Sequence, residues 1–454
     1  MIDLAAERLA AEAGAQIVRR GRSEFCERAV VDSREAGHGD LFIGLAGEHL
    51  DGGRFASDAM SAGAWGVLVD PAHGADLAGE GAGEAWVLSS PDPERSLQSL
   101  GRAWRREIGC PLVGITGSTG KTSVKDIARA LLPRRVHASP QNYNTEIGLP
   151  LALLAAPRDT EVLVMEMAMR GLGQIEQLCE IAEPDVAAIT NVGPVHLELL
   201  GTLEAIVAAK AEIITGLGAG GRAVIPEDAE ALSPHLHDQL TTFTFGAGGD
   251  VFAESVEVGS TQTRALIRTP HGEARFELPF TEAHNLANAL CAVAIGVALD
   301  LDVAEMAART ARIEFSRLRG ERVSLREGIL LLNDCYNANP VSMRAAIEHL
   351  AGHPAGGRRV AILGGMAELG PDGPAFHEEV ASLARERGIG PLIGVGQLAR
   401  DYAPDLWVEG PHEAAELAAG ELAAGDVLLV KGSRAVGLEL VADELRIALG
   451  ESES

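Results

Sequence analysis

The chain has 454 residues, of which 46% are hydrophobic and 4% aromatic, and its formal net charge is −27 at pH 7. This length exceeds a single hydrophobic core and predicts about three domains. The acidic excess argues against nucleic acid and anionic membranes as partners, because both bind a basic face, and it leaves small anionic substrates that bind in local basic pockets.

The chain carries no pattern typical of export or membrane insertion. Its five cysteines are scattered without a C-x-x-C pair, which is typical of a reducing compartment. Residues 1–20 mix charged residues with alanines, and the longest apolar runs, such as 149–157, are too short to span a bilayer. We therefore expect a cytoplasmic protein that does not insert into a membrane.

Residues 1–108 predict a first domain built from short strands and a small helix at 53–62. Ser33 and Arg34 follow the strand expected at 30–34, where a hydroxyl and a guanidinium fork can hold a phosphate. A solvated turn is the alternative reading of these two residues. No catalytic constellation stands out, so we expect a substrate-holding domain. The other strands are expected at 40–47, 65–70 and 85–90.

The segment 111–123 reads P-L-V-G-I-T-G-S-T-G-K-T-S and predicts a strand, a glycine-rich turn and a helix that Pro133 stops. The turn glycines allow close backbone approach to an anion, the helix N-terminus favours negative charge, Lys121 adds a cation and the Thr122 hydroxyl suits Mg²⁺. The spacing is G-x-x-G-K-T, shorter than the usual phosphate loop, and a turn without a ligand is the alternative. The predicted nucleotide-binding residues are Gly117, Ser118, Thr119, Gly120, Lys121, Thr122 and Ser123.

Residues 109–318 alternate strand and helix, which predicts a parallel sheet with further strands at 161–166 and 186–191. Ligands bind beyond the carboxyl ends of such strands. Glu166 ends one strand and can reach a metal beside the phosphates, although a carboxylate at a helix start is equally compatible. His196 follows the next strand and is either a further metal ligand or a loop histidine.

Lys210 lies within the apolar stripe of a helix that Thr202 is expected to cap. Burial lowers the pKa of a lysine and leaves a neutral nucleophilic amine, which is the condition for forming a carbamate with carbon dioxide. A carbamate is an anion that can bind Mg²⁺. The alternative is a lysine that extends from the edge of the stripe into solvent.

Two further polar stretches are expected near the phosphate loop. Asn142, Asn144 and Thr145 belong to the turn-rich segment Q-N-Y-N-T-E-I-G-L-P, and loops over phosphate sites commonly carry function. Asn285 begins an apolar helix at 284–299, where it either caps the helix or hydrogen-bonds a purine base.

After a charged crossing, residues 319–454 predict a Rossmann-like alternation with strands at 329–333, 359–363, 391–395 and 426–430. Polar stretches follow these strands: D-C-Y-N-A-N-P from 334, G-G-M-A-E-L-G from 364 and K-G-S-R from 431. Asp334 is well placed to bind ribose hydroxyls, and Lys431 can meet a phosphate or carboxylate.

These motifs, in this order and across essentially the whole chain, resemble the Mur ligase family. The resemblance rests on T-G-S-T-G-K-T-S, Glu166, His196, Lys210, H-N-L-A-N-A, D-C-Y-N-A-N-P and K-G-S-R. It implies an α/β fold with an N-terminal domain for a UDP-sugar peptide (1–108), a central P-loop ATPase domain (109–318) and a C-terminal Rossmann-like domain (319–454). It also implies a monomeric cytoplasmic ligase that uses ATP, two Mg²⁺ ions and an acyl-phosphate intermediate.

Within the family, Y-N-A-N-P, M-A-E-L-G and N-T-E-I-G-L-P resemble the members that add D-Ala-D-Ala to UDP-N-acetylmuramoyl-tripeptide, whereas the tripeptide-forming sibling typically has D-N-P-R. The implied substrates are therefore this tripeptide and the dipeptide. A sibling ligase or a folate polyglutamylating enzyme would share the ATP site and differ in acceptor. A nucleotide-binding scaffold without turnover would keep the fold, and absence of acceptor-dependent phosphate release would identify it.

The same resemblance assigns roles to the candidate residues. Lys121, Glu166, His196 and carbamylated Lys210 are the implied catalytic residues, and the last three, with Thr122, are the implied metal ligands. Asn285 and Asp334 would contact the nucleotide from the adenine and ribose sides. The implied substrate-binding residues are Ser33, Arg34, Asn142, Asn144, Thr145, Asn337, Asn339 and Lys431.

Two positions depart from the family pattern or align ambiguously. Gly365 stands where the family more often has aspartate. The arginine usually found just after the central domain is either Arg319 or Arg322, because R-L-R-G-E-R aligns in both ways.

Overall fold

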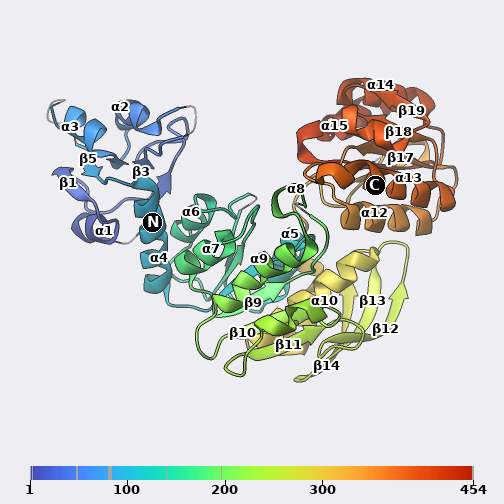
Figure 1. The fold of residues 1–454 in the computed structure, drawn as a ribbon, viewed down its shortest axis with the longest axis horizontal. Helices are drawn as coiled ribbons and strands as arrows, with labels where there is room; N and C mark the ends of the chain where they lie inside the picture. Colours follow the sequence, from blue (N-terminus) through green and yellow to red (C-terminus); the bar gives the residue numbers. More distant parts are fainter. Residues whose placement is uncertain are drawn as a thin grey trace.

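The computed structural model describes residues 2, 4–47, 50–79, 84–140, 142–195 and 197–451. Figure 1 shows an N-terminal unit in blue, a central unit in green and yellow, and a C-terminal unit in orange and red. The sheets of these units carry helices, and most of their strands are parallel. This arrangement confirms the expected α/β class and three-domain architecture, whereas the boundaries at 108/109 and 318/319 stay predictions.

The N-terminal unit is a five-stranded sheet of order β1-β5-β4-β3-β2 in which only β1 is antiparallel to its neighbour. The rings of Trp65 and Trp86 stack at 5.8 Å, and both indole N–H groups donate to the carbonyl of Ser23. The strands are β1 (Gln16–Arg19), β2 (Arg28–Val30), β3 (Asp40–Ile43), β4 (Gly66–Val69) and β5 (Trp86–Ser89). The helices are α1 (Ala6–Glu12), η1 (Gly52–Phe55), α2 (Ala56–Ser61), α3 (Pro71–Gly79) and α4 (Pro93–Ile108).

The strand expected at 30–34 is wrong in its position, because β2 ends at Val30. Asp32 accepts hydrogen bonds from the backbone N–H and the guanidinium of Arg34, and these bonds close a turn. Ser33 and Arg34 therefore lie in a turn beyond the sheet and do not continue a strand.

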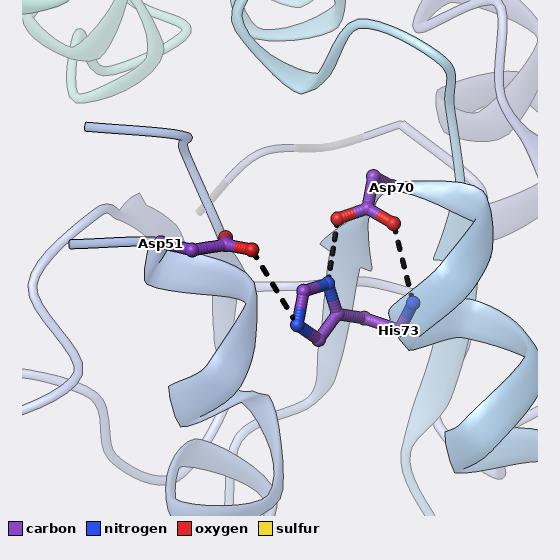
Figure 2. A group of neighbouring side chains, drawn as sticks. All are labelled: Asp51, Asp70 and His73. Carbon is purple, nitrogen blue, oxygen red and sulfur yellow. Dashed lines mark hydrogen bonds and ion pairs between the residues drawn. The ribbon is translucent and has the colours of Figure 1, made fainter. Parts of the chain in front are cut away.

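A histidine between two carboxylates joins η1 to α3 in the N-terminal unit (Figure 2). His73 Nδ1 lies 2.6 Å from Asp70, and His73 Nε2 lies 3.6 Å from Asp51. The hydrogen bond to Asp70 raises the pKa of His73 above its ordinary value. A metal between Nδ1 and Asp70 needs bonds of about 2 Å to each atom, so the 2.6 Å contact is a hydrogen bond.

The central unit contains a parallel six-stranded sheet of order β11-β10-β9-β6-β8-β7 with helices on both faces. Alternate residues of β6 point to opposite faces: Val113 and Ile115 pack with α5 and α10, whereas Leu112 packs with α6 and α7. The strands are β6 (Leu112–Thr116), β7 (Val136–Ala138), β8 (Val162–Glu166), β9 (Val186–Ile189), β10 (Arg222–Pro226) and β11 (Thr241–Phe245). The helices are α5 (Lys121–Leu131), α6 (Gly148–Leu154), α7 (Gln174–Ala182), α8 (Leu197–Leu200), α9 (Leu203–Thr215), η2 (Glu230–His235), α10 (Ala283–Ala298), α11 (Val303–Ala307) and η3 (Thr310–Arg312).

A three-stranded antiparallel sheet, which the sequence analysis missed, extends the central unit. It comprises β12 (Phe252–Val258), β13 (Thr263–Thr269) and β14 (Gly272–Leu278) and lies at the lower edge of the view in Figure 1. Ile267 and Phe276 anchor it to the core shared with α5 and α10.

The C-terminal unit is a six-stranded sheet of order β15-β16-β20-β17-β18-β19, parallel except for β15. Its strands are β15 (Glu321–Ser324), β16 (Leu330–Asn333), β17 (Arg359–Gly364), β18 (Leu392–Val395), β19 (Leu406–Val408) and β20 (Val427–Lys431). Its helices are η4 (Arg326–Gly328), α12 (Pro340–Gly352), η5 (Gly370–Asp372), α13 (Gly373–Glu386), η6 (Gln397–Tyr402), α14 (Pro411–Glu421), η7 (Arg434–Val436) and α15 (Glu439–Leu449). Across the described ranges, no helix combines the length and apolarity that a membrane span requires.

Candidate active site

A cavity of about 800 Å³ lies between the central and C-terminal units and is lined by residues of both. Another cavity, of about 860 Å³, lies among α4, α7 and the loop after α9, and none of the predicted site residues lines it. The predicted residues that line the first cavity are Ser118, Thr119, Gly120, Lys121, Thr122, Ser123, Asn142, Asn144, Thr145, Glu166, Asn285, Asp334, Asn337, Asn339 and Lys431.

The turn between β6 and α5 requires glycine at both ends. Gly117 has φ +149°, and a Cβ there would lie 1.9 Å from Thr190 Oγ1. Gly120 has φ +78°, and a Cβ there would lie 2.4 Å from Asn288 Oδ1. Any side chain would therefore strain the backbone and clash with neighbours, and the glycines keep the turn open to a ligand.

The turn is also anchored to the end of β9. Ser118 N donates to the carbonyl of Asn191 at 3.1 Å, and Thr119 N donates to Asn191 Oδ1 at 2.9 Å. Ser118 Oγ exchanges hydrogen bonds with the backbone of Gly193. Asn191 and Gly193 thus fix the phosphate loop, a supporting role that the sequence analysis did not identify.

Lys121 and Thr122, the first residues of α5, face the end of β8. Lys121 Nζ donates to the carbonyl of Gly117 at 2.7 Å, and Thr122 Oγ1 donates to Glu166 Oε2 at 2.7 Å. Burial lowers the pKa of Lys121, and the charge of Glu166 opposes that shift. A cation, a hydroxyl and a carboxylate therefore meet beside the phosphate loop.

Glu166 is buried at the end of β8 and is held from two sides. Asn144 Nδ2 donates to its Oε1 at 2.9 Å, and its backbone N–H donates to Ser139 Oγ. Burial favours the neutral acid, but the charges of Lys121 and Arg319 outweigh burial, so that the pKa of Glu166 lies below its ordinary value. An ionised carboxylate beside the Thr122 hydroxyl is a set of hard oxygen donors, and this set fits Mg²⁺.

Lys210 is 2% exposed within α9, and Thr202 caps that helix as predicted. Burial and the neighbouring charge of Lys121 bring the pKa of Lys210 well below its ordinary value. The buried position contradicts the alternative in which Lys210 extends into solvent. Lys210 lies outside the residues that line the cavity, although the repulsion from Lys121 acts on it.

Asn285 lies in the first turn of α10, behind the N-cap residue Glu282, so the alternative that Asn285 caps the helix is wrong. Asn288 Nδ2 donates to Asn285 Oδ1 at 3.1 Å, and both side chains line the cavity. The two amides form one polar patch on the central unit beside the phosphate loop.

Opposite this patch, Asp334 and Lys431 lie at the ends of the adjacent strands β16 and β20. Lys431 is 2% exposed, and its Nζ donates to Asp334 Oδ2 at 2.6 Å and to the carbonyl of Asn337 at 3.1 Å. Lys431 thus fixes the segment that follows β16. Asn339 caps α12 through a reciprocal bond with Ser342, which commits its side-chain oxygen to the helix.

The two candidate linker arginines lie in different surroundings. The Arg319 guanidinium lies 4.0 Å from the centre of the Tyr336 ring and lines the cavity, whereas Arg322 faces Thr281 and His353. The Tyr336 hydroxyl donates to Asn142 Oδ1, so the two units touch across the cavity.

The close packing of residue 365 against η6 favours glycine at this position. A Cβ on Gly365 would lie 2.4 Å from the Cβ of Leu398 in η6. An aspartate at 365 would therefore require η6 to move.

Besides Lys210, the predicted residue Gly117 does not line the cavity, and three more lie in another unit or cannot be placed. Ser33 and Arg34 lie in the N-terminal unit, and the guanidinium of Arg34 pairs with Asp32. The predicted ligand His196 lies outside the described residues.

Comparisons with known proteins agree with this geometry. The Mur ligase middle domain matches residues 115–296, and the Mur ligase, glutamate ligase domain matches residues 318–434. The UDP-N-acetylmuramoyl-tripeptide--D-alanyl-D-alanine ligase of Bacillus subtilis is 34% identical over 91% of this chain and 92% of its own length. The ligase of the same name from Escherichia coli is 31% identical over 94% and 95%.

Solved structures give the same result over nearly the full length. A crystal structure of MurF from Acinetobacter baumannii has a TM-score of 0.87 and 27% identity, covering 97% of this chain and 98% of that one. The MurF ligase from Thermotoga maritima in complex with ADP has a TM-score of 0.81 and 30% identity, covering 93% and 98%. The chain therefore belongs to the Mur ligase family.

Proposed function

We propose that this protein uses ATP to join D-Ala-D-Ala to UDP-N-acetylmuramoyl-tripeptide, giving the UDP-pentapeptide, ADP and phosphate in peptidoglycan precursor synthesis. The observation that carries the proposal is the cavity: the phosphate loop, Thr122 and Glu166 form one wall, and the D-C-Y-N-A-N-P segment forms the other. The names of the full-length relatives support the choice of substrates.

ATP is proposed to bind with its phosphates on the turn from Gly117 to Gly120. The free N–H groups at the start of α5 and the Lys121 cation favour the anion. Asn285 would contact the adenine side and Asp334 the ribose side, because they line the cavity from opposite units. Arg319, stacked on Tyr336, would add a further cation near the phosphates.

Thr122 and Glu166 would hold one Mg²⁺, and His196 and a carbamate on Lys210 would hold the second. When bound, the two ions neutralise charge on the phosphates and on the carboxylate that receives phosphate. Asn144 keeps Glu166 oriented through its amide hydrogen bond. The neutral amine is the form that adds to carbon dioxide, and burial, which lowers the pKa of Lys210, shifts the residue toward that form and supports the proposed carbamate.

The chemistry follows from the weakness of a carboxylate as an acylating agent. An oxygen of the tripeptide's terminal carboxylate attacks the γ-phosphorus, the bond to ADP breaks, and an acyl phosphate forms. The deprotonated amine of D-Ala-D-Ala attacks its carbonyl carbon, and the tetrahedral intermediate expels phosphate. Lys121 stabilises the charge that shifts from ATP toward the carboxylate.

The C-terminal unit would close over the central unit and exclude water from the acyl phosphate. Asn337, Asn339 and Lys431 would act at the dipeptide, and Ser33 and Arg34 at the UDP-sugar peptide. We place this reaction in the cytoplasm and expect a monomer, since the cavity is complete within one chain.

The test is phosphate release from MgATP with the UDP-tripeptide, with D-Ala-D-Ala, with both and with neither. Tripeptides with lysine or meso-diaminopimelate as third residue would be compared. Release that needs both substrates and yields the UDP-pentapeptide is the expected result. Release with neither, or with another amino acid in place of the dipeptide, would overturn the acceptor assignment.

A further inference from the structure

Arg170 differs from the other arginine and lysine side chains that line the cavity. Lys121 is bonded to the phosphate loop, Lys431 to Asp334, and Arg319 lies on the Tyr336 ring. The Arg170 side chain is 75% exposed, and its one ion pair within the described ranges is to Glu368, at 3.8 Å. That separation is longer than a hydrogen bond, so the guanidinium retains its donors for another anion.

The backbone that carries Arg170 is held firmly although its side chain is not. Arg170 N and Gly171 N both donate to Gln174 Oε1, at 2.6 and 3.1 Å. Glu212 of α9 accepts hydrogen bonds from Gly173 N, Ile175 N and Glu176 N at the start of α7. A fixed backbone holds the root of the Arg170 side chain at the cavity wall, so only the side chain itself must be ordered when a ligand binds.

Gln174 adds a second donor at the same place. Its Oε1 is occupied by the two backbone N–H groups, so its amide cannot flip and its Nε2 is the end left for a ligand. Both Gln174 and Arg170 line the cavity, and Arg170 lies four residues beyond Glu166. A guanidinium and a side-chain amide N–H₂ together offer several hydrogen-bond donors, and a carboxylate can accept hydrogen bonds from both.

Glu368 occupies this position from the C-terminal unit. It belongs to the M-A-E-L-G segment, has φ +62°, and its carbonyl accepts the N–H of Glu198 in α8. A carboxylate of the protein thus lies 3.8 Å from Arg170 across the gap between the units. An incoming substrate carboxylate would compete with it.

We propose that Arg170 and Gln174 form a subsite for a carboxylate of a peptide substrate that does not react, and that Glu368 occupies it in the absence of substrate. This inference rests on the proposed function. Such carboxylates exist on both substrates, at the C-terminus of the dipeptide and on the peptide of the UDP-sugar, and the experiment distinguishes them.

The test is steady-state kinetics of Arg170→Met, with each substrate varied in turn. The expected result is a KM for one peptide substrate raised about 10- to 100-fold, with kcat and the KM of ATP within about twofold of the wild type. Arg344→Met is the matched control, because Arg344 is also exposed and loosely paired, at 3.9 Å from Glu379, but does not line the cavity.

The amide-capped dipeptide D-alanyl-D-alaninamide identifies the source of the carboxylate. If the subsite binds the dipeptide, replacing the dipeptide carboxylate by the amide raises the KM of the wild type for the dipeptide. The same replacement causes no further rise in Arg170→Met. If the subsite binds the UDP-peptide, the KM of that substrate rises in the variant, and the amide affects both proteins equally.

Glu368→Gln removes the competing charge and is expected to lower the same KM about two- to fivefold. Unchanged KM values for both peptide substrates in Arg170→Met, or a raised KM for ATP alone, would overturn the subsite. Pentapeptide formation by the wild type in the same assay tests the proposed function separately.

Discussion

At the scale of single residues, the site combines two buried ionisable groups, Glu166 and Lys210, which respond differently to burial. Glu166 keeps a lowered pKa because the charges of Lys121 and Arg319 outweigh burial, whereas burial and the like charge of Lys121 both lower the pKa of Lys210. The shifts favour the anion at Glu166 and move Lys210 toward the neutral amine. These are the states in which a carboxylate binds a cation and an amine reacts with carbon dioxide.

We expect the ligase activity to depend on carbon dioxide, because carbon dioxide would form the carbamate on Lys210. Removing bicarbonate should lower kcat, and adding it back should restore kcat, because the carbamate forms reversibly on a neutral amine. Lys210→Ala should lose activity about 10- to 100-fold without recovery on adding bicarbonate. Rates in degassed and bicarbonate-supplemented buffer check this, and insensitivity of the wild type to bicarbonate would contradict it.

The pair His73–Asp70 should make stability depend on pH. The pKa of His73 is raised in the folded protein. The pair therefore contributes its full stability to the fold below the ordinary pKa of 6.5, and this stabilisation disappears as the pH rises through the pKa of the folded state. His73→Gln should therefore cost about 1 kcal/mol at pH 5.5 and much less at pH 9. Thermal unfolding at both pH values measures the difference, with His271→Gln, in the exposed turn between β13 and β14, as a control.

At the scale of elements, strand ends and helix starts bring the site together. Thr122 lies in the first turn of α5, Glu166 ends β8 and Lys431 ends β20. Each polar group therefore lies where a helix begins or a strand ends. Asn339 shows how one residue serves both the fold and the site: it caps α12 and also lines the cavity.

Substitutions at Asn339 should separate these two roles. Asn339→Ala removes the cap and should lower stability by about 1 kcal/mol, whereas Asn339→Asp keeps the cap and should leave stability nearly unchanged. If the amide also binds substrate, both variants should lose activity. Thermal unfolding and the phosphate-release assay give the two readouts, and full activity of Asn339→Asp would limit the residue to capping.

Much of this arrangement could be predicted from the sequence because the relevant signals are local. The apolar run before Gly117 and the polar residue after each strand mark a sheet edge, and period 3.6 places Lys210 inside α9. The sheet β12–β14 and strand β15 were missed although their pairing partners are neighbours in sequence, because these strands carry a weak apolar pattern: β12 has no buried residue, and β15 buries Val323 alone. The stacking of Arg319 on Tyr336 is likewise a tertiary contact between the linker and the segment after β16.

At the scale of the whole molecule, the cavity proposed to bind the nucleotide is divided between two units. Asn285 belongs to the central unit and Asp334 to the C-terminal unit, with Arg319 in the segment between them. Tyr336 and Asn142 join the units across the cavity, as do Arg170 and Glu368. Ligand binding and domain docking are therefore coupled.

A non-hydrolysable ATP analogue should stabilise both units together. At 100 times its dissociation constant, a ligand adds about 2.7 kcal/mol to the free energy of unfolding. Thermal scans should show a melting temperature that rises with the logarithm of the analogue concentration. Lys121→Met should weaken this shift, and a shift of equal size in that variant would contradict binding at the phosphate loop.

The cavity places Lys121, Arg170, Arg319 and Lys431 inside a molecule whose formal charge is −27. The net negative charge of the molecule repels an approaching nucleotide, and the four cations of the cavity attract it only over the last few ångströms. Added salt screens the distant repulsion more than the contact at the site, because the Debye length is about 8 Å at physiological ionic strength. Capture of substrate should therefore become faster as salt is raised from very low concentration, the reverse of the steering found in proteins whose surface field matches their ligand.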